Sequence, residues 1–243
     1  MNLNKYGLIL FLFLFFSTCV YIFSQDVLLI SFDTESPDNE TVMLELLSIL
    51  EKTNTKATFF VTIEFQKNLP NMIPLMLEQG HEISCHTQNH SILPFANKSL
   101  KEYELQGCKQ ILEEQYNITI KGFRAPYRMI NINTLLALKK ANYTYDASVF
   151  SIFRNMFFPS PLTEISTSSY LIFPLDDYLS LEVFHLSPEF YFKLLNNYSF
   201  KYKSYSFHPH IIMQYPLEFE QMLTNKDSNK ITHIAYLETK YGR

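Results

Sequence analysis

The sequence predicts an α/β fold in which a largely parallel sheet is wrapped by helices. Short apolar or β-branched runs alternate with stretches of helical spacing, which is typical of chains built from repeated strand–helix units. A length of 243 residues also fits one α/β barrel of ordinary size. The expected strands are residues 27–32, 57–62, 82–85, 122–124, 144–149, 170–175 and 205–207.

Helical stretches separate most of these strands. Ser99 and Ser187 precede two of the helices and suit the N-cap position, where a hydroxyl accepts a hydrogen bond from a free backbone N–H. The expected helices are residues 40–52, 71–79, 100–116, 132–140, 188–196 and 217–223.

Polar residues stand at or just beyond the C-terminal ends of several expected strands. In parallel α/β folds these ends form one rim, where ligands and active sites collect. The sequence therefore predicts that these side chains belong to one site. They are Asp33, Glu35, His86, Arg124 and His208.

The first residues of the chain are a separate segment. Residues 7–23 are almost entirely apolar, and a single nearby cation, Lys5, precedes them. The length of this run lies between that of a signal-peptide core and that of a minimal membrane span. We expect residues 1–25 to be a signal peptide or an N-terminal membrane anchor, and 26–243 to be a catalytic domain outside the cytoplasm.

Charge and cysteine content exclude two classes of protein. A formal net charge of −4 without a dense Lys/Arg cluster argues against nucleic-acid binding, which depends on neutralising phosphates. Only Cys85 and Cys108 lie beyond the apolar segment, so the chain is not a disulfide scaffold. Whether these two cysteines pair is left open by the sequence.

Asp33 and Glu35 follow the first strand two positions apart. In an extended chain they point to the same side, while Thr34 points away. One carboxylate can then bind a metal ion while the other accepts a proton. The alternative is that both residues only cap the next helix or face solvent.

His86 and His90 are four positions apart in the segment HTQNH. If the chain turns into a helix after the strand, both imidazoles lie on one face and can bind one ion. Water bound to such an ion is a usable nucleophile near neutral pH, which makes a hydrolase the first hypothesis. The alternative is a surface coincidence or a hydrogen-bonded core pair. His81 lies outside this spacing, and we interpret it as structural.

Two further fragments offer catalytic groups. Arg124 precedes a stiff turn at Pro126 and is a plausible partner for Asp33, while the backbone N–H of Tyr127 is free to face an oxyanion. His208 ends the last strand and titrates in the range that suits a general acid. Taken singly, each of these residues could equally be a surface or packing residue.

The ordered motifs SFDTES, HTQNH, RAPY and SFHPH resemble those of the polysaccharide deacetylases, a carbohydrate-esterase group that includes chitin, chitooligosaccharide and peptidoglycan deacetylases. The resemblance runs from about Val27 to the C-terminus. It implies a distorted (β/α) barrel of about seven mostly parallel strands. It also implies metal-dependent removal of N-acetyl or O-acetyl groups from sugars of a cell-surface or extracellular polysaccharide.

The resemblance also implies roles for single residues. Much of the family has adjacent aspartates in the first motif, whereas Asp33-Thr34-Glu35 matches a subgroup with an Asp-x-Glu motif. The fourth motif normally pairs Asp with Trp, and this chain has no Trp; Asp176 and Asp177 are the nearest candidates. The implied roles are Asp33 as general base, His208 as general acid, Arg124 as the partner that orients Asp33, Tyr127 as oxyanion donor, and Glu35, His86 and His90 as metal ligands.

Zinc is the expected metal, and two histidines with one carboxylate also accept cobalt or nickel. Two other functions compete with the deacetylase. One is an amidase or imidase on the same barrel, which the export segment disfavours because a small intracellular metabolite is an unsuitable target outside the cell. The other is a non-catalytic glycan-binding surface module, which would need neither a base at Asp33 nor an acid at His208.

Overall fold

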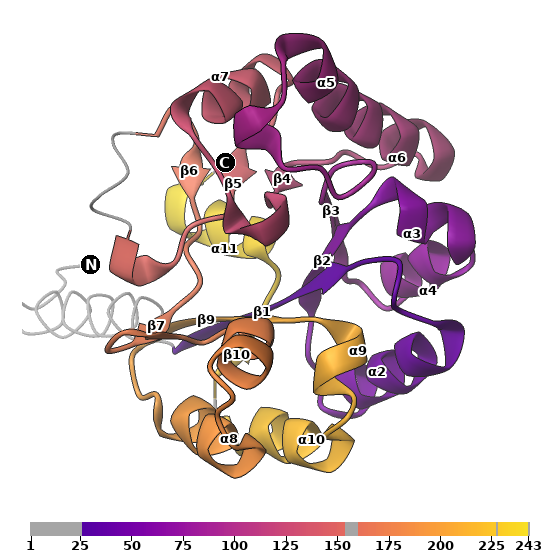
Figure 1. Ribbon diagram of the computed structural model, residues 1–243. Coiled ribbons are helices and arrows are strands. Elements are labelled where there is room, and N and C mark those ends of the chain that lie inside the picture. The colour runs from indigo at the N-terminus through magenta and orange to yellow at the C-terminus, as the bar shows by residue number, and fades with distance from the viewer. Residues whose placement is uncertain (1–25, 154–159, 227, 243) are drawn as a thin grey trace, which may run out of the picture.

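The computed structural model describes residues 26–153, 160–226 and 228–242. A curved parallel sheet lies at its centre and helices ring it, as Figure 1 shows. Seven strands follow one another around the sheet in the order β9-β1-β2-β3-β4-β5-β6, and β10 pairs with the first residues of β1. The predicted distorted barrel is confirmed. The strands are β1 (Val27–Thr34), β2 (Ala57–Val61), β3 (Glu82–Cys85), β4 (Gly122–Phe123), β5 (Tyr145–Asp146), β6 (Thr163–Glu164), β9 (Tyr202–Phe207) and β10 (Asn229–Lys230).

β1 is the central strand of this sheet. One edge pairs with β2 from Ile30 to Thr34, and the other pairs with β9 from Val27 to Phe32. All residues of β1 after Val27 are buried, as expected for a parallel strand that is covered on both faces. Because all of these pairings are parallel, the C-terminal ends of β1, β2, β3 and β9 lie at the same end of the barrel.

Most helices lie outside the sheet, and polar residues cap several of them. Asn39 accepts a hydrogen bond from Val42 N at the start of α2, and Ser187 caps α8 as predicted. Ser99 was a wrong prediction, because Asn97 caps that helix. The helices are α2 (Glu40–Lys52), α3 (Ile63–Asn68), α4 (Met72–Glu78), α5 (Lys98–Glu102), η2 (Tyr103–Gly107, a π-helical turn), α6 (Cys108–Tyr116), α7 (Ile132–Lys140), η5 (Tyr178–Val183, also π-helical), α8 (Pro188–Asn197), α9 (Pro209–Ile212), α10 (Pro216–Asn225) and α11 (His233–Tyr241).

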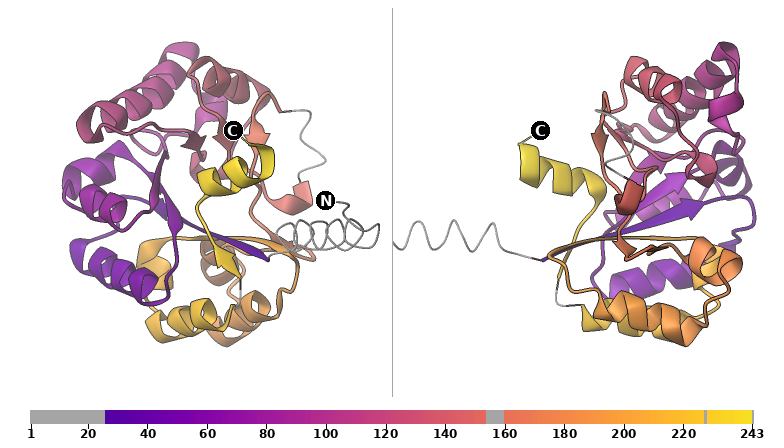
Figure 2. Two further views of the ribbon diagram at one scale, coloured as in Figure 1. Left: turned by 180° about the vertical axis from the view of Figure 1, so that it is seen from behind. Right: turned by 60° about the vertical axis from the view of Figure 1, so that its left-hand side comes forward.

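The core has two parts. The larger part joins the outer face of the sheet to the surrounding helices. The smaller part fills the inside of the barrel, where Leu237 of α11 joins a cluster that includes Leu29, Phe60 and Tyr145. Figure 2 shows α11 lying across the end of the barrel away from the viewer of Figure 1. α11 therefore covers that end of the barrel, while the predicted site residues lie at the C-terminal ends of the strands.

One predicted strand is wrong. Residues 170–175 do not form a parallel strand of the barrel but take part in an antiparallel hairpin of β7 (Ser169–Tyr170) and β8 (Phe173–Pro174). The chain turns sharply at Leu171, where φ is 54°. The sixth strand of the barrel is instead β6, whose two residues are too few to give an alternation pattern in the sequence.

The proposed signal peptide or membrane anchor, residues 1–25, lies outside the described residues. Within the described part of the chain, no helix has both the length and the apolar composition needed to cross a bilayer.

Candidate active site

A pocket of about 410 Å³ opens at the C-terminal ends of β1, β3 and β9. It contains most of the predicted site residues, which come from segments far apart in the chain. The position agrees with the rule that parallel α/β sheets bind ligands at the carboxyl ends of their strands. The lining residues are Asp33, Glu35, Pro37, His86, His90, Tyr127, Arg128, Phe150, Asp176, Tyr178, Leu179, His208 and His210.

Glu35, His86 and His90 converge on one point. Oε1 of Glu35 lies 3.0 Å from Nε2 of His90 and 3.5 Å from Nε2 of His86. One ligand atom from each of the three side chains lies within 4.8 Å of the other two. Since Nδ1 of His86 hydrogen bonds to the carbonyl oxygen of Arg124 at 2.8 Å, Nε2 is the nitrogen left to bind an ion. Two imidazoles and a carboxylate form a donor set that suits a divalent transition metal.

The histidines converge without the helix that their spacing predicted. Residues 86–90 form an irregular loop, with positive φ angles of 70° at Thr87 and 54° at His90. The two imidazole ring centroids are nevertheless 5.1 Å apart. The structure brings the two predicted ligands together, whereas the helix predicted for this segment is wrong.

Contacts from the next helical segment hold this loop in place. The buried carboxylate of Glu104, in η2, accepts hydrogen bonds from the backbone N–H groups of Gln88 and Asn89 at 2.8 and 3.1 Å. It also accepts one from the Ser91 hydroxyl at 2.6 Å. These bonds replace the regular hydrogen bonds that a helix would have supplied to residues 86–90.

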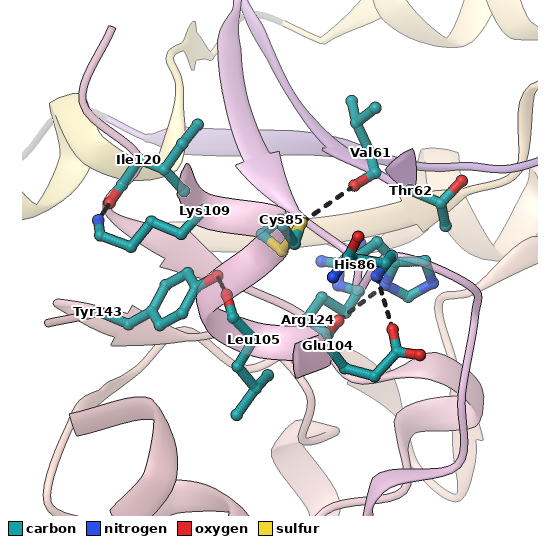
Figure 3. The surroundings of a disulfide bond; sticks show 12 residues. Val61, Thr62, Cys85, His86, Glu104, Leu105, Lys109, Ile120, Arg124 and Tyr143 are labelled. Atoms are coloured by element: carbon teal, nitrogen blue, oxygen red, sulfur yellow. Dashed lines mark hydrogen bonds between the residues drawn. A yellow bond between two sulfur atoms is a disulfide. The ribbon is translucent and has the colours of Figure 1, made fainter. Parts of the chain in front are cut away.

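The two cysteines that the sequence left open are paired. Cys85 of β3 and Cys108 of α6 form a disulfide, with their Cα atoms 6.2 Å apart. Figure 3 shows this bond beside His86 and Arg124. The disulfide joins the strand that carries a predicted metal ligand to the helix that follows Glu104. The disulfide therefore covalently restrains the start of the loop formed by residues 86–90, called the ligand loop below.

Asp33 is paired with Arg124, as predicted. Nη1 of Arg124 donates to Oδ1 of Asp33 at 2.5 Å, and both side chains are almost completely buried. The guanidinium also donates to the Ser31 hydroxyl and to the carbonyl oxygen of Ala147. Burial alone would raise the pKa of Asp33, but the positive charge of Arg124 and of neighbouring groups holds it well below its ordinary value. Asp33 is thus an ionised carboxylate, able to accept a proton.

Arg128 is a site residue that the sequence reasoning missed. Its guanidinium donates to Asp176 Oδ2 at 3.2 Å, to Thr167 Oγ1 at 3.0 Å and to the hydroxyl of Ser206. Its Nε also lies 3.9 Å from Oδ2 of Asp33. Its position directly after the RAPY segment could have identified it from the sequence. Like Arg124, it lies beside buried acidic side chains.

His208 is held by Asp177. Nδ1 of His208 lies 2.8 Å from Oδ1 of Asp177, and the His208 backbone N–H donates to the other oxygen at 2.8 Å. Burial would lower the pKa of His208, but the carboxylate of Asp177 raises it to about 10, so that the imidazole is protonated near neutral pH. Nε2 points toward two carboxylates, and lies 4.0 Å from Asp33 Oδ2 and 3.9 Å from Glu35 Oε1.

The two adjacent aspartates therefore have different partners. Asp177 hydrogen bonds to His208, whereas Asp176 forms an ion pair with Arg128. Both side chains are nearly inaccessible to solvent. The structure thus brings both candidates for the fourth motif to the site. One of them contacts Arg128 and the other contacts His208.

Tyr127 borders the pocket through a strained turn. Its φ is 56° and that of Arg128 is 57°, a conformation that L-residues seldom adopt in succession. Among the described residues, none accepts a hydrogen bond from the Tyr127 backbone N–H. This N–H is therefore available to a ligand, as predicted. The ring is largely exposed, and its centroid lies 4.7 Å from that of His90.

One alternative interpretation of the acidic pair is wrong. Neither Asp33 nor Glu35 caps the next helix, because Asn39 does so. His81, by contrast, is structural as expected: its Nδ1 accepts a hydrogen bond from Ala57 N at 3.2 Å, away from the pocket.

Comparisons with known proteins show what this chain is similar to. A family model described as "Polysaccharide deacetylase" matches residues 22–145. A peptidoglycan-N-acetylglucosamine deacetylase of Bacillus cereus is 30% identical over 114 residues, which cover 47% of this chain and 41% of the relative. The chain spans less than half the length of the first curated relatives that it matches.

Solved structures show the same fold. The peptidoglycan deacetylase PdaC of Bacillus subtilis superposes with a TM-score of 0.65 and 17% identity, covering 90% of this chain and 93% of that one. A CE4-family pseudoenzyme of Bacillus anthracis superposes with a TM-score of 0.67 and 13% identity, covering 88% and 66%. Since these identities are low, they speak for the fold alone. On the match of its family model, this chain belongs to the polysaccharide deacetylase family.

Proposed function

We propose that this protein is a metal-dependent hydrolase that removes acetyl groups from the N-acetylated sugars of a cell-surface or extracellular polysaccharide. The observation that carries the proposal is the convergence of Glu35, His86 and His90 beside an ionised Asp33 and a protonated His208. Curated relatives are named as peptidoglycan-N-acetylglucosamine and chitooligosaccharide deacetylases, which supports the same class of substrate. O-acetylated sugars are a second substrate of the same kind.

Glu35, His86 and His90 would hold the ion, and Glu35 as the carboxylate ligand fits the Asp-x-Glu subgroup. When bound, a divalent metal such as zinc polarises a carbonyl group and lowers the pKa of water. Cobalt and nickel would suit the same donors.

The side chains of the pocket supply the remaining chemistry. Asp33 accepts a proton from the attacking water, whose oxygen bonds to the acetyl carbonyl carbon. The N–H of Tyr127 stabilises the oxyanion of the tetrahedral intermediate. His208 donates its Nε2 proton to the amine nitrogen as the C–N bond breaks, so that acetate and a free amino sugar leave. Arg124 and Asp177 keep the base and the acid in their positions.

The location outside the cytoplasm is part of this proposal. It rests on the apolar run of residues 7–23, which suits a signal peptide or an N-terminal anchor ahead of a catalytic domain over 26–243. A location outside the cell would also disfavour an amidase or imidase that acts on a small intracellular metabolite.

The experiment is acetate release from a panel of acetylated glycans. Protein stripped of metal with a chelator is compared with the same protein after zinc, cobalt or nickel is restored, and Glu102→Gln serves as a control at an exposed ion pair far from the pocket. We expect stripping to abolish activity and restoration to recover it. Activity that survives complete removal of metal would overturn the proposal, and glycan binding without acetate release would favour the non-catalytic module.

A further inference from the structure

Four histidines line the active-site pocket, and one of them, His210, has no role in the chemistry proposed above. It lies in α9, directly beyond the predicted acid, and its ring centroid is 5.9 Å from that of His208. Its side chain is 30% exposed. The motif SFHPH contains both histidines, and the sequence indicated a role for His208 alone.

The ring of His210 is fixed by a buried carboxylate, that of Asp38. Nδ1 of His210 lies 2.9 Å from Asp38 Oδ1, and the backbone N–H of His210 donates to the same oxygen at 2.9 Å. The other oxygen of Asp38 accepts from the backbone N–H of Glu35 at 2.9 Å. Asp38 therefore links the loop of a predicted metal ligand to His210 and gives the imidazole a defined orientation.

This orientation leaves one ring nitrogen for a ligand. Because Nδ1 faces the Asp38 carboxylate, Nε2 is the ring nitrogen left for a ligand, and in the tautomer that carries its hydrogen on Nδ1 it accepts a hydrogen bond. None of the described residues hydrogen bonds to this atom. His208 is fixed in a similar way, since its Nδ1 faces Asp177 and its Nε2 points to the reacting groups. Of the four imidazoles that line the pocket, those of His208 and His210 are thus each oriented by a buried carboxylate.

We propose that His210 positions the substrate by accepting, at Nε2, a hydrogen bond from a hydroxyl group of the sugar. In the proposed reaction His208 protonates the amine nitrogen of the substrate. Because His210 lies beside His208, its Nε2 should face the sugar ring that carries this nitrogen or the ring next to it. Hydroxyl groups are the hydrogen-bond donors that a neutral sugar offers there. The inference rests on the proposed function and adds a specificity-determining residue to it.

Two substitutions separate this role from a structural one. His210→Asn places an amide nitrogen near the position of Nδ1, which keeps the contact with Asp38 but removes the acceptor from the pocket. His210→Gln places an amide oxygen near the position of Nε2, which keeps the acceptor but loses the contact with Asp38. His185→Asn is the control, because His185 is exposed, lies outside the pocket lining and has a positive φ that Asn tolerates.

The first readout is the steady-state kinetics of acetate release from tetra-N-acetylchitotetraose. For His210→Asn we expect KM to rise about five- to tenfold, the equivalent of one lost hydrogen bond, with a much smaller change in kcat. His210→Gln should keep a KM closer to that of the unmodified protein. The opposite order, with Asn tolerated and Gln impaired, would show that only the tie to Asp38 matters and would overturn the inference.

The second readout requires no turnover. Binding of tetra-N-acetylchitotetraose is measured by calorimetry in protein that carries Asp33→Asn, with and without His210→Asn. We expect the second substitution to weaken binding by the same five- to tenfold factor. An unchanged affinity would overturn the inference. A protein that binds the glycan through His210 but never releases acetate would refute the proposed function instead, so that the two failures are distinguishable.

Discussion

Arg124 donates a hydrogen bond of 2.5 Å to Asp33, a residue 91 positions away in the sequence. Asp33 is the last residue but one of the central strand β1, and Arg124 follows β4 at the same end of the barrel. The bond fixes the predicted base and keeps it ionised in a place where burial opposes charge. The proposed base and the group that orients it thus come from two different strand–helix units.

Asp33→Asn should remove the base while keeping an acceptor for the hydrogen bond from Arg124. The amide oxygen of Asn can still accept from Arg124, but the side chain can no longer take a proton from water. We expect kcat for acetate release to fall about 10²- to 10⁴-fold. Bound metal, measured by elemental analysis, should remain because Asp33 is not one of the three convergent ligands. A variant that keeps most of its turnover would show that another group acts as the base.

Arg128→Met should destabilise the fold through the charge it leaves behind. Asp176 is almost fully buried, and Arg128 is the cation that pairs with it. Removal of one partner of a buried ion pair typically costs about 3 to 5 kcal/mol. We expect a loss of that order in the free energy of unfolding, measured in urea at constant metal content. The double variant with Asp176→Asn should recover part of it; no recovery would mean that the ion pair is not the cause.

His81 should make stability fall in acid. Burial, with a smaller effect of Lys56, lowers the pKa of His81 to about 4 from an ordinary value of 6.5. Between these two pH values the unfolded chain binds a proton that the folded chain does not, so stability rises with pH over this window and is lost as pH falls through it. The loss amounts to about 3 kcal/mol by pH 4.

Asparagine at position 81 tests this assignment. The amide oxygen of His81→Asn can accept from Ala57 N in place of Nδ1 but does not titrate. We expect urea denaturation curves of this variant to show a flatter dependence of stability on pH between 4 and 6.5. A dependence as steep as that of the unmodified protein would assign the effect to other groups.

Loss of the disulfide should lower stability and loosen the ligand loop. The bond closes a segment with a sequence separation of 23 residues, for which the chain-entropy model gives about 3 kcal/mol. We therefore expect the double variant Cys85→Ser/Cys108→Ser to unfold at lower urea concentration and to bind zinc more weakly, because Cys85 precedes His86. Unchanged zinc affinity would show that Glu104 alone is sufficient to hold the loop.

The sequence predicted the parallel sheet and the polar residues that meet at the C-terminal ends of its strands. It did so because motifs at the strand ends and buried apolar runs are local signals. It did not predict the irregular loop at 86–90, because the contacts of Glu104 with Gln88 and Asn89 cross between elements. β6 was missed for a related reason: a strand of two residues is defined by its neighbours and not by its own pattern.

The sequence motifs did not indicate a role for three residues, Arg128, Asp38 and His210. Each lies within three residues of a residue that was assigned a role, yet its function depends on a partner distant in the sequence. Asp38 and His210 are 172 positions apart, and only folding brings their polar atoms within 2.9 Å. Hydrogen bonds of this kind between distant residues leave no periodicity or spacing in the chain.

The convergence of Glu35, His86 and His90 on one ion is tested most directly by zinc titration calorimetry on chelator-stripped protein. We predict one zinc ion per chain, and a loss of affinity of at least tenfold in both His90→Ala and Glu35→Gln, while His185→Asn binds as the unmodified protein does. Zinc binding that is unchanged in His90→Ala and Glu35→Gln would contradict the proposed ligand set, and with it the hydrolytic mechanism.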